Sequence, residues 1–224
     1  DKNPRIVDMA VDALAEKDNY EGLVAILERY DSLPPTSKQF VDRFPRRFQR
    51  ASADLLRSPS RSARINALSY LSKAGAVTNL PSLVTFLSHS DSELRNKAIE
   101  SFLGIVHRWR ETEPDEPAPT DRGGEPAERR IVLGCLEEAL NGYHIHQADV
   151  LFEELLHFGK KAYPILMRQM RQQTPVSQAI LQYIQRKPTT ESMSFLIYMF
   201  SSNDPESQTM SRVVMSQLPG DMLT

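Results

Sequence analysis

The stretch from residue 144 to 157 holds the side chains best suited to metal chemistry. Its imidazoles and carboxylates are His144, His146, Asp149, Glu153, Glu154 and His157. On one continuous helix, His146 and His157 would share a face with two of these carboxylates, because the spacings are three and four residues. Glu154 and His157 also have the Glu-x-x-His spacing of carboxylate-bridged di-iron sites, which need two such motifs. The chain contains one, so we predict a solvated helix face that binds no metal or cofactor. A metal-dependent enzyme centred on residues 146–157 stays open as an alternative.

Nucleophilic catalysis has no support in the sequence. Cys135, the single cysteine, lies in the apolar run 131–136, where a free thiol behaves as a small buried hydrophobe. Neither a Gly-x-Ser-x-Gly elbow nor a Gly-x-x-x-x-Gly-Lys phosphate loop occurs. We therefore predict that the chain is not an enzyme.

Arginine is concentrated in one segment near residue 50. Seven arginines occupy 22 residues: Arg43, Arg46, Arg47, Arg50, Arg57, Arg61 and Arg64. The only carboxylates in or beside this segment are Asp42 and Asp54. A guanidinium makes planar, two-point contacts with carboxylate or phosphate, and Arg43, Arg47 and Arg50 would lie on one helical face. Solvated surface is the competing interpretation of this segment. The residues that we predict to bind a partner are Arg43, Arg47, Arg50, Arg57 and Arg61.

The charge and composition of the chain limit the kind of partner. The net charge of −2 argues against a whole-domain electrostatic grip on nucleic acid. We expect a protein partner, acidic or phosphorylated, and keep nucleic-acid binding by residues 43–61 as an alternative. No apolar run approaches the roughly 20 residues of a membrane span. The lone cysteine suits a reducing compartment, and Asp1 is not followed by a signal-peptide pattern. We therefore expect a cytoplasmic segment of a larger protein.

Helix punctuation recurs along the whole chain. A capping residue precedes proline at four places, namely Asn3-Pro4, Ser58-Pro59, Thr174-Pro175 and Asp204-Pro205. Strand signals are nearly absent. The expected helices lie near 4–16, 20–30, 37–56 with a break at Pro45, 60–74, 80–88, 91–110, 127–141, 145–158, 162–172, 175–186, 190–201 and 205–218. Short connections between them predict helix pairs that pack antiparallel.

The helix pairs repeat at a regular offset. Sliding the sequence by 31 residues places Arg64 on Arg95 and Ala67 on Ala98. Sliding it by 60 residues places 23–27 on 83–87, and the two C-terminal cap–proline pairs lie thirty residues apart. A single helix pair cannot bury its apolar stripe alone, so neighbouring pairs must stack.

These residues resemble a HEAT repeat. The resemblance runs from Ala63-Arg64 to Leu71, through Gly75 and Pro81 to Asp91, Arg95 and Ala98, and again over 159–170. It implies an all-α, right-handed α–α superhelix of five to six pairs, with the related armadillo repeat as the nearest alternative. It also implies a structural ladder of Arg64, Asp91 and Arg95. The pattern is broken at Ser60, where HEAT repeats have aspartate, and at Gln208, where they have arginine, so the expected ladder is partial.

One segment interrupts the repeats. Residues 111–128 hold four prolines, two glycines and seven acids, with no large apolar side chain. Such a segment cannot offset its ordering entropy by burial, so we predict a flexible acidic loop. The expected organisation is a helical lobe over 1–110, this loop over 111–128, and a second lobe over 129–224. The predicted function is a binding or scaffolding module.

Overall fold

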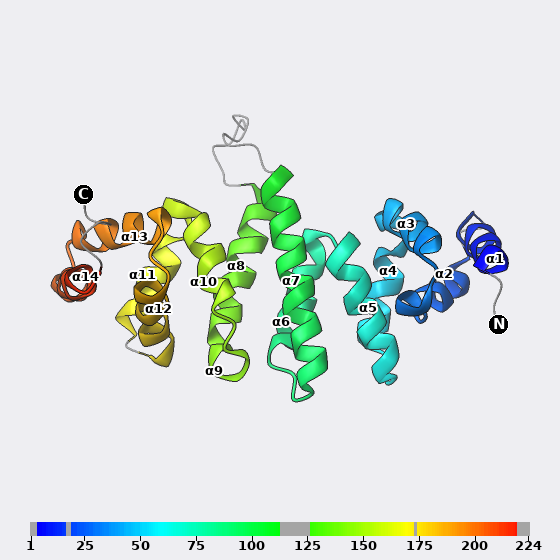
Figure 1. The fold of residues 1–224 in the computed structure, drawn as a ribbon, viewed down its shortest axis with the longest axis horizontal. Coiled ribbons are helices and arrows are strands. Elements are labelled where there is room, and N and C mark those ends of the chain that lie inside the picture. The colour runs from blue at the N-terminus through cyan, green and yellow to red at the C-terminus, as the bar shows by residue number, and fades with distance from the viewer. Residues whose placement is uncertain (1–3, 17–18, 113–125, 173, 219–224) are drawn as a thin grey trace. The chain divides into compact units, whose positions relative to one another are not determined.

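The computed structural model describes residues 4–16, 19–112, 126–172 and 174–218. These residues form fourteen α-helices, three 3-10 turns and no strand (Figure 1). The predicted all-α class is therefore confirmed. No helix within these ranges is long and apolar enough to cross a membrane.

The chain divides into two compact units, 1–135 and 136–224. The helices of the first unit are α1 (Pro4–Glu16), α2 (Tyr20–Leu27), α3 (Pro35–Arg43), α4 (Pro45–Leu56), α5 (Arg61–Ala74), α6 (Leu80–Leu87) and α7 (Ser92–Thr112), with 3-10 turns η1 (Tyr30–Ser32) and η2 (Val77–Asn79). Helix α8 (Ala127–Asn141) contains the boundary. The second unit holds α9 (Tyr143–His146), α10 (Val150–His157), η3 (Gly159–Lys161), α11 (Tyr163–Arg171), α12 (Pro175–Arg186), α13 (Thr190–Phe200) and α14 (Pro205–Ser216).

The predicted acidic loop is shorter at both ends than expected. Residues 111 and 112 belong to α7, and residues 127 and 128 begin α8. The remainder, 113–125, lies outside the described residues. The division into lobes over 1–110 and 129–224 stays a prediction.

Local side chains start most helices where the sequence indicated. Proline occupies the first position of α3, α4, α12 and α14, where the missing N–H costs no hydrogen bond. The hydroxyl of Ser60 accepts from the Ala63 amide at 3.3 Å and so caps α5. Asp91 Oδ1 accepts from the amides of Glu93 and Leu94 at 2.9 and 3.2 Å, which caps α7.

In the first unit, helices stack on their second neighbours. Helix α1 packs on α3, α2 on α4, and α5 on α7, while α4–α5 and α6–α7 form pairs. Glycine permits the closest approach, because a Cβ at Gly104 of α7 would lie 2.5 Å from the carbonyl oxygen of Ser72 in α5. Beside it, the Ser101 hydroxyl donates to the Leu68 carbonyl at 2.6 Å. The α5–α7 contact is thus a backbone-to-backbone contact.

In the second unit, α11–α12 and α13–α14 form pairs, and α11 also packs on α13 and α14. The Tyr163 ring of α11 lies 5.3 Å from that of Phe195 and 4.9 Å from that of Tyr198. The Ser211 hydroxyl of α14 donates to the Leu196 carbonyl of α13 at 2.7 Å. Aromatic and buried polar contacts therefore join the two pairs.

One predicted helix, 145–158, is wrong. It is broken at Gln147, whose φ of 48° and ψ of 36° lie in the left-handed region, and this conformation ends α9 before α10 begins. The imidazole of His146 helps to hold the turn, because its Nδ1 accepts from the Ala148 amide at 3.0 Å.

Candidate functional site

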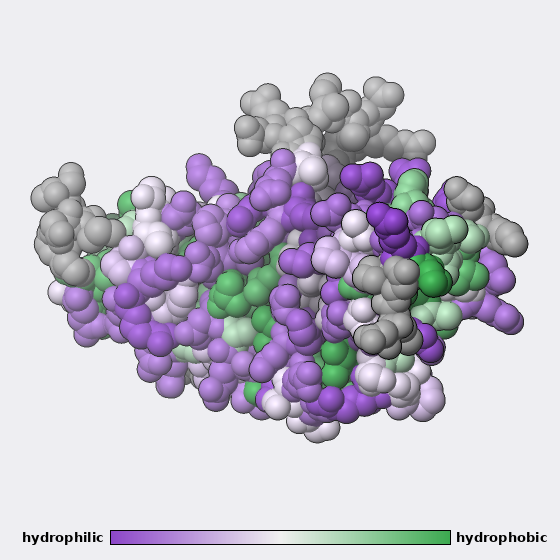
Figure 2. Space-filling view, turned by 45° about the vertical axis from the view of Figure 1, so that its right-hand side comes forward, coloured by the Kyte–Doolittle hydropathy of each residue, from purple (hydrophilic) through white to green (hydrophobic). Residues whose placement is uncertain are grey.

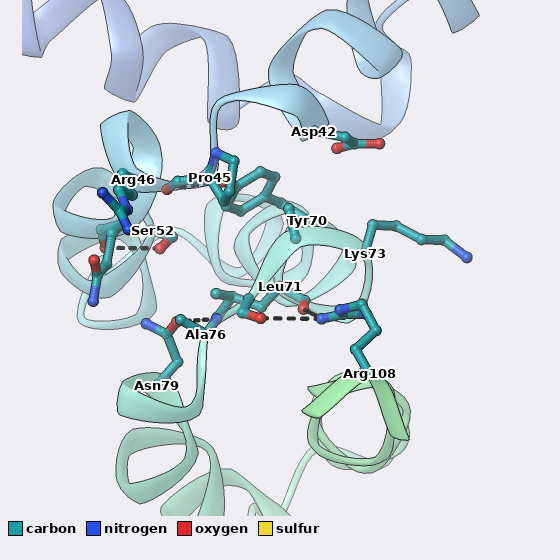
Figure 3. A pocket seen from close by; sticks show the side chains of 13 residues that line it. Asp42, Pro45, Arg46, Ser52, Tyr70, Leu71, Lys73, Ala76, Asn79 and Arg108 are labelled. Atoms are coloured by element: carbon teal, nitrogen blue, oxygen red, sulfur yellow. Dashed lines mark hydrogen bonds between the residues drawn. The ribbon is translucent and has the colours of Figure 1, made fainter. Parts of the chain in front are cut away.

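A cavity of about 410 Å³ opens in the first unit between α4, α5 and α7 (Figure 3). Its charged lining comes from four places in the chain: Asp42 at the end of α3, Arg46 in α4, Lys73 in α5 and Arg108 in α7. Three cations therefore surround one carboxylate. Such a lining favours a ligand that carries negative charge.

Arg108 builds one wall of this cavity. Its guanidinium donates to the carbonyls of Leu71 and Gly75, both at 3.2 Å, and to that of Ser72. These carbonyls lie at the C-terminal end of α5, where a cation is favoured by the helix dipole. Burial lowers the pKa of Arg108. We assign this arginine mainly to structure, since its donors are already used.

Asp42 is held inside the ring of cations. Its Oδ1 accepts from the Tyr30 hydroxyl at 2.8 Å. Burial raises the pKa of Asp42, whereas the Tyr30 hydrogen bond and the charges of Lys73 and Lys38 lower it. The carboxylate therefore offsets only part of the surrounding positive charge.

Arg46 and Lys73 are the cations most available to a ligand. Both are exposed, and neither forms an ion pair among the residues that the structure describes. Elsewhere cations of the chain do meet carboxylates, as Arg168 meets Glu137 at 2.8 Å. The cavity thus has positive charge that the fold itself does not neutralise.

Tyr70 adds a buried donor to the same wall. Its side chain is 1% exposed, and its hydroxyl has one long contact, 3.5 Å to the Pro45 carbonyl. Burial raises the pKa of Tyr70, so the phenol stays protonated. A buried hydroxyl with so poor an acceptor is unusual, and an acceptor oxygen supplied by a ligand would satisfy it.

The predicted arginine face is divided between two helices. Arg43 ends α3, whereas Arg47 and Arg50 lie on α4. Pro45 causes the break, because it lacks an N–H and disfavours helical geometry at the preceding residue. The guanidinium of Arg47 lies 5.2 Å from the Phe44 ring, and that of Arg50 lies 4.9 Å from the Tyr20 ring. The expectation of one helical face therefore fails for Arg43.

The other two predicted binding arginines have intramolecular carboxylates. Arg57 lies 3.9 Å from Asp54, and both side chains are largely exposed. Arg61 pairs with Asp91 at 2.6 Å and with Glu93 at 2.5 Å. The charge of Arg61 is therefore largely neutralised before any partner arrives.

The implied ladder of Arg64, Asp91 and Arg95 is joined differently in the structure. Asp91 pairs with Arg61, which holds the pKa of that carboxyl down to about 2. The Nε of Arg64 is buried without a hydrogen-bond partner. Arg95 donates to the His89 carbonyl at 2.7 Å. One rung therefore links α5 to the start of α7 through Arg61, three residues before the arginine that the resemblance implied.

The histidine–carboxylate set of residues 144–157 does not gather into one site. His146 Nε2 lies 3.0 Å from the Ala139 carbonyl, and His157 Nδ1 lies 2.8 Å from the Glu153 carbonyl. Asp149 pairs with Arg186 at 2.5 Å. Glu153 pairs with Lys187 at 2.8 Å. In the described parts of the chain, no three such residues are placed to hold a metal ion.

Sequence reasoning missed most of the cavity. Arg46 belongs to the arginine-rich segment but was not selected, and Tyr70, Lys73 and Arg108 come from other helices. Only the stacking of α4, α5 and α7 brings them together. No family model matches the chain, and no curated protein is significantly similar to it.

Proposed function

We propose that this chain is a non-catalytic binding or scaffolding module built as a right-handed, HEAT-type helical solenoid. Its α4–α5–α7 cavity and the neighbouring arginines receive an acidic or phosphorylated segment of a protein partner. The observation that carries the proposal is the pair Arg46 and Lys73, two exposed cations at one cavity without a carboxylate partner in the described residues.

Support for the solenoid comes from the sequence separation of contacts between helices. In the first unit, Gln49–Thr78, Arg61–Asp91 and Leu68–Ser101 are 29, 30 and 33 residues apart. In the second unit, Glu137–Arg168, Arg171–Asp204 and Glu153–Lys187 are 31, 33 and 34 residues apart. Each of these contacts spans about one helix pair. Contacts restricted to neighbouring repeats are the signature of a repeat array.

Support for an acidic partner comes from the chemistry of the cavity. Arginine offers a planar fork to carboxylate or phosphate, and lysine adds a compact charge. The Tyr70 hydroxyl provides a third donor that lacks a good acceptor. Acidic side chains and phosphate groups offer only acceptors at neutral pH, so they match all three.

The proposal can be tested with labelled acidic peptides. One probe is a glutamate-rich peptide, and the other carries phosphoserine at its centre. The double variant Arg46→Glu, Lys73→Glu should bind both at least about tenfold more weakly at low salt, because lost and reversed surface contacts together cost about 1.4 kcal/mol. The matched control is Lys160→Glu, Lys161→Glu, which reverses two exposed charges in η3.

Three results would discriminate the alternatives. Equal peptide affinity in the cavity variant and the η3 control would refute the cavity as the binding site. Tighter binding of duplex DNA or single-stranded RNA than of either peptide, with a steep loss in salt, would favour the nucleic-acid alternative. Stoichiometric metal in the purified protein, measured by elemental analysis, would revive the metal-dependent enzyme.

A further inference from the structure

The outer face of α13–α14 carries exposed apolar side chains in helical register. Ile197 is 56% exposed, Phe200 42% and Val213 51%. Met193 and Met210 are half-buried beside them. On α13 these positions are spaced by four and three residues, and on α14 by three, so each helix presents an apolar stripe. A helix exposed on this side would ordinarily be polar there.

The preceding pair shows what such a stripe does. Helices α12 and α14 both begin at proline, thirty residues apart. Subtracting thirty from the five exposed or half-buried positions gives Tyr163, Met167, Met170, Ile180 and Tyr183. All five are buried, none more than 6% exposed. Helix α11 carries the first three of them and packs against α13 and α14. The corresponding face of α13–α14 therefore has the side chains of a helix-stacking interface, with nothing covering them among the described residues.

A second uncovered stripe lies on α1. Its residues Ile6, Met9, Ala10 and Ala13 are exposed and follow the spacing of three, four and seven residues that defines one helical face. The opposite side of the helix carries Val11, which is buried. In Figure 2 hydrophilic surface predominates, and green apolar surface gathers at the right, the side on which α1 lies in Figure 1. Helix α1 is thus apolar on two sides.

We propose that the outer face of α13–α14 in one copy of the chain docks on the outer face of α1 in a second copy, head to tail. The two faces have opposite charges beside their apolar stripes. Asp12 is exposed next to the α1 stripe, and the Arg212 guanidinium lies 5.2 Å from the Phe200 ring. Pairing α13–α14 with itself would bring two copies of Arg212 together, and like charges oppose such a contact. The inference is independent of the cavity, because none of these residues lines it.

A head-to-tail contact has a distinctive consequence. Each copy keeps one free face of each kind after docking, so assembly continues beyond the dimer unless a ring closes. Only a few side chains form each stripe, and interfaces smaller than about 1,200 Å² are typically weak. We therefore expect sedimentation velocity of the full chain to show a series of oligomers that grows with protein concentration.

Two charge insertions test the direction of the contact. Met9→Arg disables the α1 face, and Ile197→Arg disables the α13–α14 face; both side chains are more than half exposed. Each variant alone should sediment as a monomer. An equimolar mixture should form a dimer and nothing larger, because one intact face of each kind remains in the mixture. Ile6→Arg and Val213→Arg replace them if either variant loses helical circular dichroism.

The control is Ile145→Arg, an exposed apolar position on α9 outside both faces, which should assemble like the unmodified chain. A monomeric unmodified chain at all concentrations would overturn the proposal. Dimers of Met9→Arg alone would show α13–α14 pairing with itself, and dimers of Ile197→Arg alone would show α1 pairing with itself. Either result also excludes the head-to-tail contact. Peptide binding by the cavity is unaffected in every case.

Discussion

Adding one methyl group to either of two helical glycines should change stability in opposite directions. At Gly134 in α8, an added Cβ meets no heavy atom within 4 Å, so Gly134→Ala gains only helix propensity, about 0.5–1 kcal/mol. At Gly104 in α7, the Cβ would lie 2.5 Å from the Ser72 carbonyl oxygen. That oxygen belongs to the backbone of α5, so the helices must separate, and overpacking of this kind costs about 1–3 kcal/mol. The propensity gain offsets part of this, leaving Gly104→Ala destabilised by about 2 kcal/mol.

The difference can be measured with a probe that the chain already contains. Trp109, the only tryptophan, is buried in α7 one turn beyond Gly104, so its fluorescence reports unfolding at this contact. For a chain of this size, about 1 kcal/mol corresponds to roughly 2–4 °C in Tm. Gly134→Ala should therefore melt a few degrees higher than the unmodified chain, and Gly104→Ala several degrees lower. Equal shifts in the two variants would refute the close approach of α5 and α7, and with it one wall of the cavity.

Three further substitutions test local features. The folded pKa of Asp91, about 2, lies below the unfolded value of about 3.9, so its stabilisation is present above pH 4 and lost as pH falls to about 2. Asp91→Asn, followed by denaturant titration at each pH, should lose stability less steeply over that window; parallel curves would contradict the Arg61 pairing. Gln147→Gly should raise the free energy of unfolding by about 0.5–1 kcal/mol, because a left-handed conformation strains any side chain with a Cβ. Gly159→Ala should lower it by about 1 kcal/mol for the same reason, since Gly159 has φ +56°; unchanged urea midpoints would argue against these backbone conformations.

Helix positions follow from the sequence because their signals are local. Proline before α12 and α14, and the Ser60 hydroxyl at α5, act within one turn of the residues that they affect. The interruption at Phe44 was expected for the same reason, since Pro45 acts on its immediate neighbour. The break at Gln147 was missed because glutamine is not a residue that favours left-handed backbone, and its turn is held by the imidazole of His146.

Contacts between helices were less predictable. The thirty-residue offset placed Asp91 opposite α5, but it did not distinguish Arg61 from Arg64, which are one turn apart on the same helix. That choice depends on how far α7 is shifted along α5, a tertiary quantity that no short motif contains. The cavity has the same origin, because Arg46 and Arg108 are brought together only by the stacking of helices.

The hydrogen bonds of Arg108 make the cavity sensitive to strain between helix pairs. The guanidinium belongs to α7 and its three carbonyl acceptors to the end of α5, and Lys73 lies on that same last turn. A small tilt of one helix against the other would break these bonds and move Lys73 relative to Arg46. Ligand occupancy and stiffness are then linked reciprocally. An anion bound in the cavity resists bending at this point of the chain, and a load that bends the chain here releases the anion.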